Sequence, residues 1–466
     1  MIVSLLSLAT AITEITPFWL VATAEEESAE PEGSIILAGV LLSLVAIYIA
    51  SKIGGELCSR INLPPVLGEL VGGVVIGTSV LGLLVFPEAG ATAEDSLIMA
   101  FLEQTTALEP GTAEAVFEAQ GEVITVLSEL GVVILLFEIG LESDLKELLR
   151  VGPQAAAVAI TGVVAPFVGG TAGLYYGFGV PAIPAIFAGA ALTATSIGIT
   201  AKVLAELGQL NSKEGQIIIG AAVIDDVLGI IILAVVASLI KTGNIEITNI
   251  LYLVVSAAAF LVGTIIIGRF ISPFLVGMVN EMKTRGELLL TALVFAFALA
   301  YVATAIELEA ILGAFAAGLV LAETEKRKEL EEQVVPVADI LVPVFFVCVG
   351  ARTDLGVLNP AVPSNREGLI LAAFLIVVAI IGKTIAGYTI FGASEINKLA
   401  IGVGMVPRGE VGLVFAGVGS ASGALSPSTE AAIIVMVILT TFIAPPFLRV
   451  VFPEPSEAEA SKQEGT

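Results

Sequence analysis

The sequence predicts an all-α protein that crosses a membrane many times. Hydrophobic residues make up 57% of the 466 residues, and the mean hydropathy is +1.01. The apolar residues lie in runs of about twenty, the length of helix that crosses a bilayer's hydrocarbon core, and short polar segments separate these runs. They fill nearly the whole chain and leave no room for a soluble catalytic or nucleotide-binding domain. The function must therefore lie inside the membrane.

Thirteen transmembrane helices are predicted between residues 34 and 452, which we take as one membrane domain. They cover residues 34–51, 64–85, 122–140, 153–176, 182–206, 215–240, 249–271, 287–306, 308–322, 334–350, 368–391, 398–420 and 429–450. Lysines and arginines gather in alternate connections, whereas the other connections contain only Lys241, Arg352 and Arg366. The positive-inside rule makes the basic connections cytoplasmic, so the chain enters the first span from outside and ends in the cytoplasm.

The segments outside these spans have distinct compositions. Residues 1–24 form an apolar stretch that fits either a signal peptide or one extra N-terminal helix, because Ala22 and Ala24 suit cleavage but no lysine or arginine precedes them. Residues 453–466 have the composition of a disordered cytoplasmic tail.

The longest connection, residues 87–121, contains several acidic residues and no basic one, so we expect it outside the cytoplasm. Its apolar piece, Leu97–Leu102, suits a short interfacial helix, although a tolerated insertion is the simpler interpretation.

Charge and residue usage exclude several classes of function. The net charge of −25 comes mostly from loops and tails, and it argues against a nucleic-acid partner. Cys58 and Cys348 lie far apart in apolar surroundings, so we interpret them as packing residues rather than a disulfide or a metal pair. The chain has no histidine, so any pH response near neutrality must come from carboxylates or lysines.

Two adjacent aspartates lie in the middle of the span at 215–240. Asp225 and Asp226 interrupt the apolar run IIIGAAVIDDVLGIIILAVV, which places both carboxylates near the midplane of the membrane. A charge at that depth costs at least about 2.5 to 3.5 kcal/mol, and it usually faces a watered cavity that admits an ion or a proton. Neighbours on a helix point about 100° apart, so one can bind while the other tunes or relays. The alternative is a structural pair satisfied by hydroxyl groups.

Lys383 is the second charge deep in a predicted span, at 368–391. An ammonium group there needs a carboxylate partner, and a cation that displaced it would leave the lysine free to lose its proton. Such an exchange couples cation entry to proton exit. A permanent structural bridge is the alternative interpretation.

Two spans contain residues that interrupt helices. The span at 182–206 holds the hydroxyl-rich run Thr193–Gly198, and the span at 398–420 has glycines and a proline around Arg408 and Glu410. Interrupted helices at the midplane expose carbonyl groups and helix ends that suit ions. The first break precedes the aspartates and the second follows Lys383, as inverted repeats would place them. Ordinary glycine-rich helix packing is the alternative.

Motifs along the chain resemble one family of transporters. They are LPPVLGELVGGVVIG, LGVVILLFEIGLESDL, ALTATSIGITAKVLAELGQL, AAVIDDVLG, LGAFAAGLVLAE, PVFFVCVGARTDL, IGKTIAG and GMVPRGEVGLVFA. In this order, over about Ser34–Val450, the chain closely resembles bacterial NapA-type sodium/proton antiporters, in the second branch of the monovalent cation:proton antiporter family. The VIDD and MVPRGEVGL segments are the most specific.

The resemblance implies a homodimer. Each protomer would have a dimerisation domain and a core domain with two discontinuous crossing helices, and the core would move as an elevator. The family carries its ion or proton on the residue that matches Asp226, and it pairs the residues that match Asp225 and Lys383. Both aspartates are thereby implied as Na⁺ ligands.

Further residues match family positions around this site. Thr195 and Ser196 would lie at the crossing, while Glu69, Arg408 and Glu410 match other charged positions. Two adjacent aspartates with a lysine resemble the electrogenic branch, which exchanges more protons than sodium ions. The implied partners are monovalent cations, protons and membrane lipid, with no cofactor, in a bacterial inner membrane or an equivalent energy-coupling membrane.

Physical chemistry leads to the same kind of mechanism. A carboxylate can hold a proton or a dehydrated sodium ion, and mutual exclusion at one alternately exposed site produces obligatory exchange. Proton competition should then stop transport as the pH falls. A K⁺/H⁺ antiporter or a K⁺ efflux system of the same superfamily stays open, as does Li⁺ as cargo. An intramembrane aspartyl protease is remote, because it needs two aspartates that face each other from separate helices.

Overall fold

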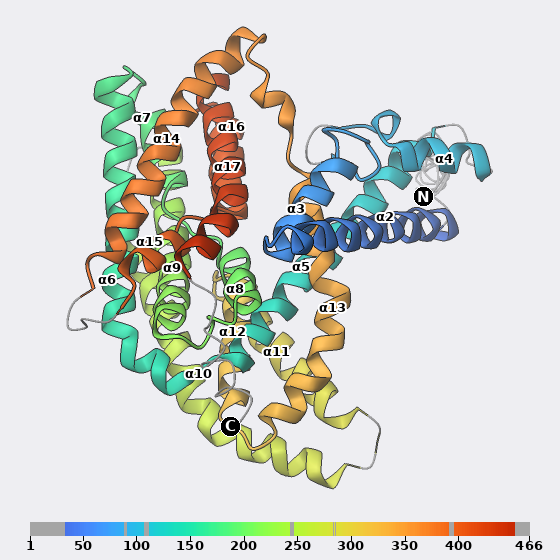
Figure 1. Cartoon of the computed structure of the whole chain (residues 1–466), viewed down its shortest axis with the longest axis vertical. Helices are drawn as coiled ribbons and strands as arrows, with labels where there is room; N and C mark the ends of the chain where they lie inside the picture. Colours follow the sequence, from blue (N-terminus) through green and yellow to red (C-terminus); the bar gives the residue numbers. More distant parts are fainter. Residues whose placement is uncertain are drawn as a thin grey trace, which may run out of the picture.

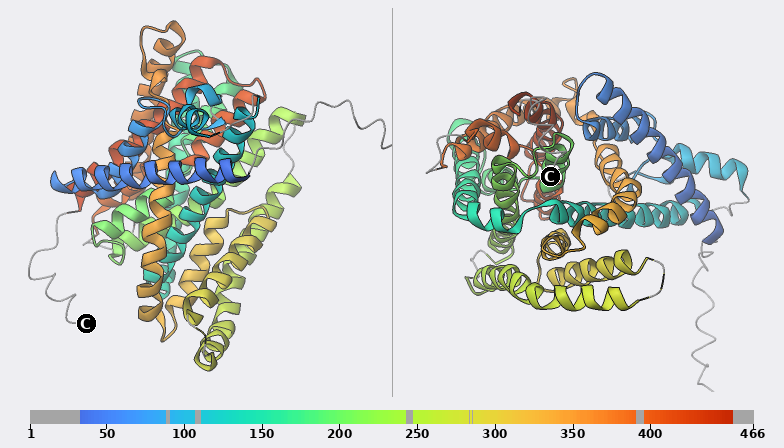
Figure 2. Two further views of the ribbon diagram at one scale, coloured as in Figure 1. Left: turned by 90° about the vertical axis from the view of Figure 1, so that its right-hand side faces the viewer. Right: turned by 60° about the horizontal axis from the view of Figure 1, so that its bottom comes forward.

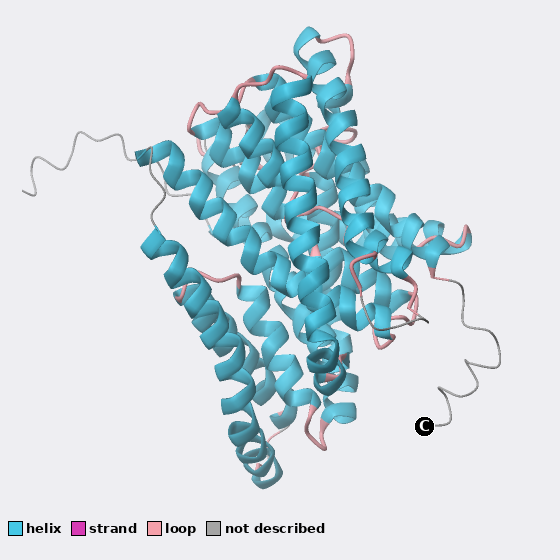
Figure 3. Ribbon diagram, turned by 90° about the vertical axis from the view of Figure 1, so that its left-hand side faces the viewer, coloured by secondary structure: helices cyan, strands magenta, loops and turns pink. Residues whose placement is uncertain are grey.

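The computed structural model describes residues 33–87, 91–106, 111–242, 247–282, 284, 286–390 and 396–452. Every regular element in these ranges is helical, which confirms the predicted all-α class (Figure 3). The helices are α2 (Gly33–Arg60), α3 (Pro65–Ile76), α4 (Leu97–Thr105), α5 (Ala113–Glu142), α6 (Leu145–Ala172), α7 (Ala182–Ala191), α8 (Ile197–Glu206), α9 (Lys213–Thr242), α10 (Ile247–Glu281), α11 (Glu287–Ala305), α12 (Ala310–Ala322), α13 (Arg327–Ala351), α14 (Pro363–Gly387), α15 (Lys398–Gly404), α16 (Glu410–Ala421) and α17 (Pro427–Val451). Short turns are η3 (Ala93–Asp95), η4 (Gly173–Gly177) and η5 (Leu355–Leu358).

Nine helices in the described ranges are long and apolar enough to cross a membrane, and this confirms a multi-pass membrane protein. They are α2, α5, α6 with η4, α9, α10, α11, α13, α14 and α17. The other four predicted spans coincide with shorter helices, namely α3, the pair α7 and α8, α12, and the pair α15 and α16. The count of thirteen spans stays a prediction.

The loop predicted at 87–121 is largely helical where it is described. It contains η3 and α4, and α5 already begins at Ala113 rather than near residue 122. Leu97–Leu102 belongs to α4, whose Met99 and Leu102 are buried against Phe117 of α5. The helix therefore packs on protein. Residues 1–24 and 453–466, predicted as an N-terminal signal or helix and a C-terminal tail, lie outside the described residues.

Polar caps and prolines start several of the helices. The Asp144 carboxylate accepts the backbone N–H groups of Lys146 and Glu147 at the start of α6. Asn397 and Ser426 play the same part at the starts of α15 and α17. Such caps satisfy donors that the first helical turn leaves open, and a proline at the first position, as in α3, α14 and α17, needs no such partner.

The helices form two groups (Figure 1). In the first, which we call the site group, α6, α7, α8, α9, α14, α15, α16 and α17 pack on one another. In the second, which we call the panel, α2, α3, α5, α11, α12 and α13 do so. Helix α10 packs against α9, α12 and α11, and Figure 2 shows it beside α11 at one edge of the molecule. Each half of the chain thus contributes its first helices to the panel and its later ones to the site group.

The two groups meet chiefly at the C-terminal end of the first interrupted span. Helix α8 packs against α3 and α5 of the panel, and Glu206 at its end accepts the backbone N–H of Val66 at 3.2 Å. One hydrophobic cluster joins Val203 and Leu204 of α8 to Leu135 of α5. Helices α7 and α16 instead contribute to a cluster built mainly from the site group. The contact between the two groups is therefore concentrated at α8.

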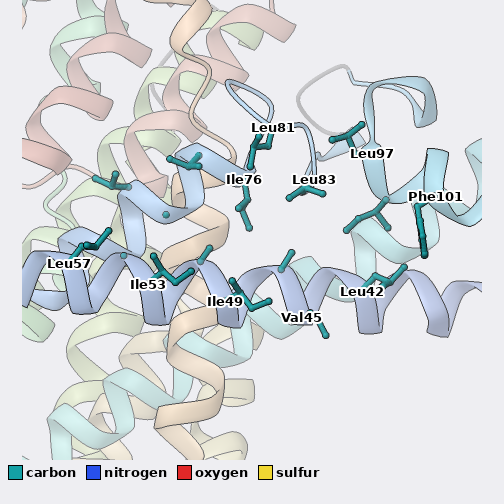
Figure 4. Close-up of a pocket in the computed structure, with 17 residues that line it drawn as sticks. Leu42, Val45, Ile49, Ile53, Leu57, Ile76, Leu81, Leu83, Leu97 and Phe101 are labelled. Atoms are coloured by element: carbon teal, nitrogen blue, oxygen red, sulfur yellow. The ribbon is translucent and has the colours of Figure 1, made fainter.

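An open apolar groove of about 800 Å³ lies between α2, α3 and α4 (Figure 4). Leu42, Val45, Ile49, Ile53 and Leu57 of α2 line one wall, and Leu97 and Phe101 of α4 line another. Every fourth residue of α2 from Leu37 to Leu57 is apolar and between 54% and 59% exposed. A ridge of this kind suits lipid or protein rather than water.

Candidate functional site

Helix α9 carries Asp225 and Asp226 into the middle of the site group. The side chain of Asp225 is fully buried and that of Asp226 is 7% exposed. The flanking residues Ile224 and Val227 are apolar, so the adjacent positions of the helix offer these carboxylates no charged partner. Their compensation must come from other helices.

Asp225 receives that compensation from two elements. The Lys383 ammonium of α14 donates to Asp225 Oδ2 at 2.8 Å, and the Thr195 hydroxyl donates to the same oxygen at 2.6 Å. Lys383 also donates to the Thr193 carbonyl at 2.8 Å, and its side chain is fully buried. Both charges are therefore paired and hydrogen-bonded, which is the condition under which buried charges are tolerated.

The two interrupted helices hold each other at their breaks. The first is unwound between Ala191 and Ile197, and the second between Gly404 and Glu410. The Ser196 N–H donates to the Pro407 carbonyl at 2.9 Å, and the Thr200 hydroxyl donates to the Gly404 carbonyl at 2.9 Å. These bonds replace part of the helical hydrogen bonding that each chain loses at its break.

Arg408 fills the space between the breaks. Its side chain is fully buried, and Nη1 donates to the Ala194 carbonyl at 2.9 Å. The guanidinium thus lies against carbonyl groups just beyond the C-terminal end of α7, where the helix dipole favours a cation. Asp225, Asp226, Lys383 and Arg408 would carry no net charge together if both aspartates were ionised.

Asp226 faces different surroundings. It lines a cavity of about 10 Å³ together with Thr195, Ser196 and Gly409 from the two breaks and Glu309 from the panel. Ala194, Ile197, Ile311 and Val411 complete the lining. This volume is about the smallest that holds one water molecule. The residues around the cavity therefore include two with carboxylates and two with hydroxyl groups, the ligand types that hard cations prefer.

The structure gathers most of the predicted site residues and separates one. Asp225, Asp226, Lys383, Thr195, Ser196 and Arg408 lie together at the breaks. Glu69 lies instead on α3 of the panel, where it accepts a hydrogen bond from Ser51 at 3.0 Å. Glu410 begins α16, but its side chain lies outside the described part of the chain.

Sequence reasoning missed Glu309. It precedes the short apolar run 310–322, and nothing in its local sequence distinguishes it from the other acidic residues of connections. Only the packing of α12 brings it to the cavity of Asp226.

The cysteines and the acidic residues do not indicate a metal centre. Cys58 and Cys348 are free thiols, and Cys58 is partly exposed whereas Cys348 is buried. Within the described ranges, no group of three or more histidine, cysteine, aspartate or glutamate side chains could hold a metal ion. A monovalent ion at Asp226 would be cargo rather than a resident cofactor.

Comparisons with known proteins agree with this architecture. Residues 34–452 match the family model described as "Sodium/hydrogen exchanger, transmembrane". The chain is 68% identical over 450 residues to the high-affinity Na⁺/H⁺ antiporter NhaS3 of Synechocystis, which covers 96% of this chain and 97% of that protein. It is 34% identical over 425 residues to the Na⁺/H⁺-K⁺ antiporter GerN of Bacillus cereus, with 90% and 98% covered.

A solved structure shares the fold. The sodium proton antiporter MjNhaP1 of Methanocaldococcus jannaschii superposes with a TM-score of 0.56 at 16% sequence identity, over 89% of this chain and 96% of that one. At this identity the likeness concerns the fold alone.

Proposed function

Because the chain belongs to the family of transmembrane sodium/hydrogen exchangers, we propose that it is a secondary Na⁺/H⁺ antiporter whose carrier is Asp226. The observation that carries this proposal is the contrast between two adjacent carboxylates in one buried helix. Asp225 is neutralised by Lys383, whereas Asp226 lines a cavity of one-water size. This contrast supports Asp226, rather than Asp225, as the carboxylate that takes up a small cation.

Exchange follows from competition at Asp226. Its carboxylate can hold a proton or a sodium ion, and Thr195 and Ser196 of the same cavity offer further oxygens to the ion. Obligatory exchange results if only the loaded site can reach the other side of the membrane. Because protons and sodium compete, we expect the Na⁺ concentration for half-maximal transport to rise as the pH falls, with little change in maximal rate.

The Asp225–Lys383 pair supplies a second route for protons. A sodium ion that draws on Asp225 weakens the hold on the Lys383 ammonium, which can then release a proton. Two protons would leave for one sodium ion, and transport would be electrogenic. In this movement the site group would slide along the panel as an elevator. The limited contact between the two groups, around α8, would be the surface along which they slide.

The groove on α2 suits the homodimer that the family resemblance implies. A second copy would cover the ridge from Leu37 to Leu57 and the groove beside it, so that the panels meet and the site groups stay free to move. Native mass spectrometry and cross-linking of Ile53→Cys test this: a dimer linked through α2 supports it, and a monomer at all protein concentrations contradicts it.

The decisive experiment measures proton flux against each cation. Proteoliposomes with an acidic interior and a pH-sensitive dye receive NaCl, LiCl or KCl, and we expect Na⁺ and Li⁺ to collapse the gradient. Asp226→Asn should abolish the response. Asp339→Asn, the same change at an exposed residue of α13, is the matched control and should leave it intact.

Each outcome of this experiment has a clear meaning. Sodium uptake without opposing proton movement would overturn antiport, and retained exchange in Asp226→Asn would overturn the site. A response to K⁺ as strong as to Na⁺ would favour the second candidate, a K⁺/H⁺ antiporter. We consider this candidate because the name of the Bacillus cereus relative includes K⁺. We expect the protein in a bacterial inner or equivalent energy-coupling membrane, with its C-terminus in the cytoplasm.

A further inference from the structure

The cavity of Asp226 has one wall that belongs to the other helix group. Glu309 lines it from the panel, beside Ile311, whereas Asp226, Thr195 and Ser196 come from the site group. The site that would carry the ion is therefore completed by an acidic residue from a helix group that does not contain the carrier residue.

The connection between α11 and α12 holds Glu309 in this position. Helix α11 ends at Ala305, and Glu307 adopts a left-handed backbone with φ of 65°, which is costly for a residue with a side chain. Leu308 is only 5% exposed and fastens the turn to the core. Glu309 then occupies the N-cap position of α12 without a capping hydrogen bond from its side chain, and the helix dipole stabilises a negative charge there.

Helix α12 is in turn fixed tightly to α5. Gly318 of α12 and Gly140 of α5 face each other so closely that an added Cβ on Gly318 would lie 2.3 Å from the Phe137 carbonyl oxygen. Two helices that meet backbone to backbone cannot slide without separating. Glu309 is thus presented by a rigid part of the panel.

The two carboxylates differ in their access to water. Glu309 is exposed, whereas Asp226, which lines the same cavity, is 7% exposed. A hydrated cation that approaches from this side meets the glutamate before the aspartate. A carboxylate at such a mouth raises the local cation concentration and the rate of cation arrival.

We propose that Glu309 is an affinity-determining residue that captures Na⁺ at the mouth of the site and transfers it to Asp226. This proposal rests on the proposed function. Because Glu309 belongs to the panel, it serves the ion only while the cavity faces this side of the membrane, which the positive-inside rule makes the external side. When the site group moves, Asp226 leaves Glu309 behind, and its affinity on the cytoplasmic side does not depend on that glutamate.

The experiment compares Glu309→Gln with Glu307→Gln in proteoliposomes of known orientation. Glu307 is exposed, carries the same charge and belongs to the same connection, but does not line the cavity, so its variant is the matched control. We expect Glu309→Gln to raise the Na⁺ KM for external sodium about three- to tenfold, with nearly unchanged maximal rate. The KM for cytoplasmic sodium and both values for Glu307→Gln should stay at the wild-type level.

Two further variants separate the possible failures. Glu309→Asp keeps the charge and should restore the external KM in large part, whereas a fall in maximal rate shared by both Glu309 variants would indicate a structural cap and overturn the proposal. An unchanged external KM in Glu309→Gln, alongside an inactive Asp226→Asn, would overturn this inference alone. An active Asp226→Asn would overturn the proposed function itself.

Discussion

The surroundings of Asp225 and Asp226 differ more than their adjacency in sequence suggests. Asp225 is fully buried and holds the Lys383 ammonium and the Thr195 hydroxyl on one oxygen. Asp226, rotated by about 100° on the same helix, lines a cavity that is bordered by residues of both breaks and of the panel. One helical step thus separates a carboxylate that is paired with a buried lysine from a carboxylate that lines a cavity.

The largest expected effect on stability tests this division. Asp225→Ala leaves Lys383 buried without its carboxylate, and we expect a loss of about 3 to 5 kcal/mol in the free energy of unfolding. Asp226→Ala should cost less, because Asp226 lines a cavity in which a water molecule can replace part of the interaction that is lost. Denaturant unfolding of purified protein in detergent measures both. Equal losses would remove the distinction between the two aspartates.

The second prediction concerns voltage. If Lys383 releases a transported proton, Lys383→Ala should make transport insensitive or nearly insensitive to membrane potential, because a carried charge is worth about 2.3 kcal/mol for each 100 mV. Solid-supported membrane currents at imposed potentials measure this. Lys398→Ala, at the start of α15, is the control and should keep the wild-type dependence. An unchanged voltage response in the first variant would assign Lys383 to structure alone.

The third prediction concerns the hydroxyl that the two regions share. Thr195 donates to Asp225 and also lines the cavity of Asp226. Thr195→Val keeps the shape but removes a hydrogen bond to a charged group, so we expect about 1.5 to 3 kcal/mol less stability. Thr195→Ser should recover most of the loss in the same unfolding assay. A fully stable valine variant would show that Lys383 alone compensates Asp225.

The smallest effect is expected on the Asp226 side. Ser196→Ala removes a hydroxyl from the cavity but keeps the backbone bond from Ser196 to Pro407. We expect the Na⁺ KM to rise about two- to tenfold, the value of one neutral hydrogen bond, with unchanged stability. Flux assays over a range of NaCl concentrations measure it. An unaffected KM together with lower stability would show that the Ser196 hydroxyl stabilises the fold and does not contribute to Na⁺ affinity.

Much of the fold and part of the site could be predicted from local sequence. The apolar runs predicted the all-α membrane class, and the polar residues within them directed attention to Asp225, Asp226 and Lys383. Helix boundaries in the region 87–121 were harder to predict. Its acidic composition suggested a loop, whereas burial of Met99 and Leu102 against α5 stabilises a helix there.

The sequence alone determined that the long apolar runs are helical and which charges lie within them, because a membrane forces each apolar run to satisfy its own backbone hydrogen bonds and makes every interior charge conspicuous. Tertiary structure decided which charge meets which partner. Asp225 and Lys383 are 158 residues apart, and Glu309 reaches the cavity of Asp226 only because α12 is packed against α5. Such contacts depend on how whole helices are rotated and packed, and no local run of residues specifies that.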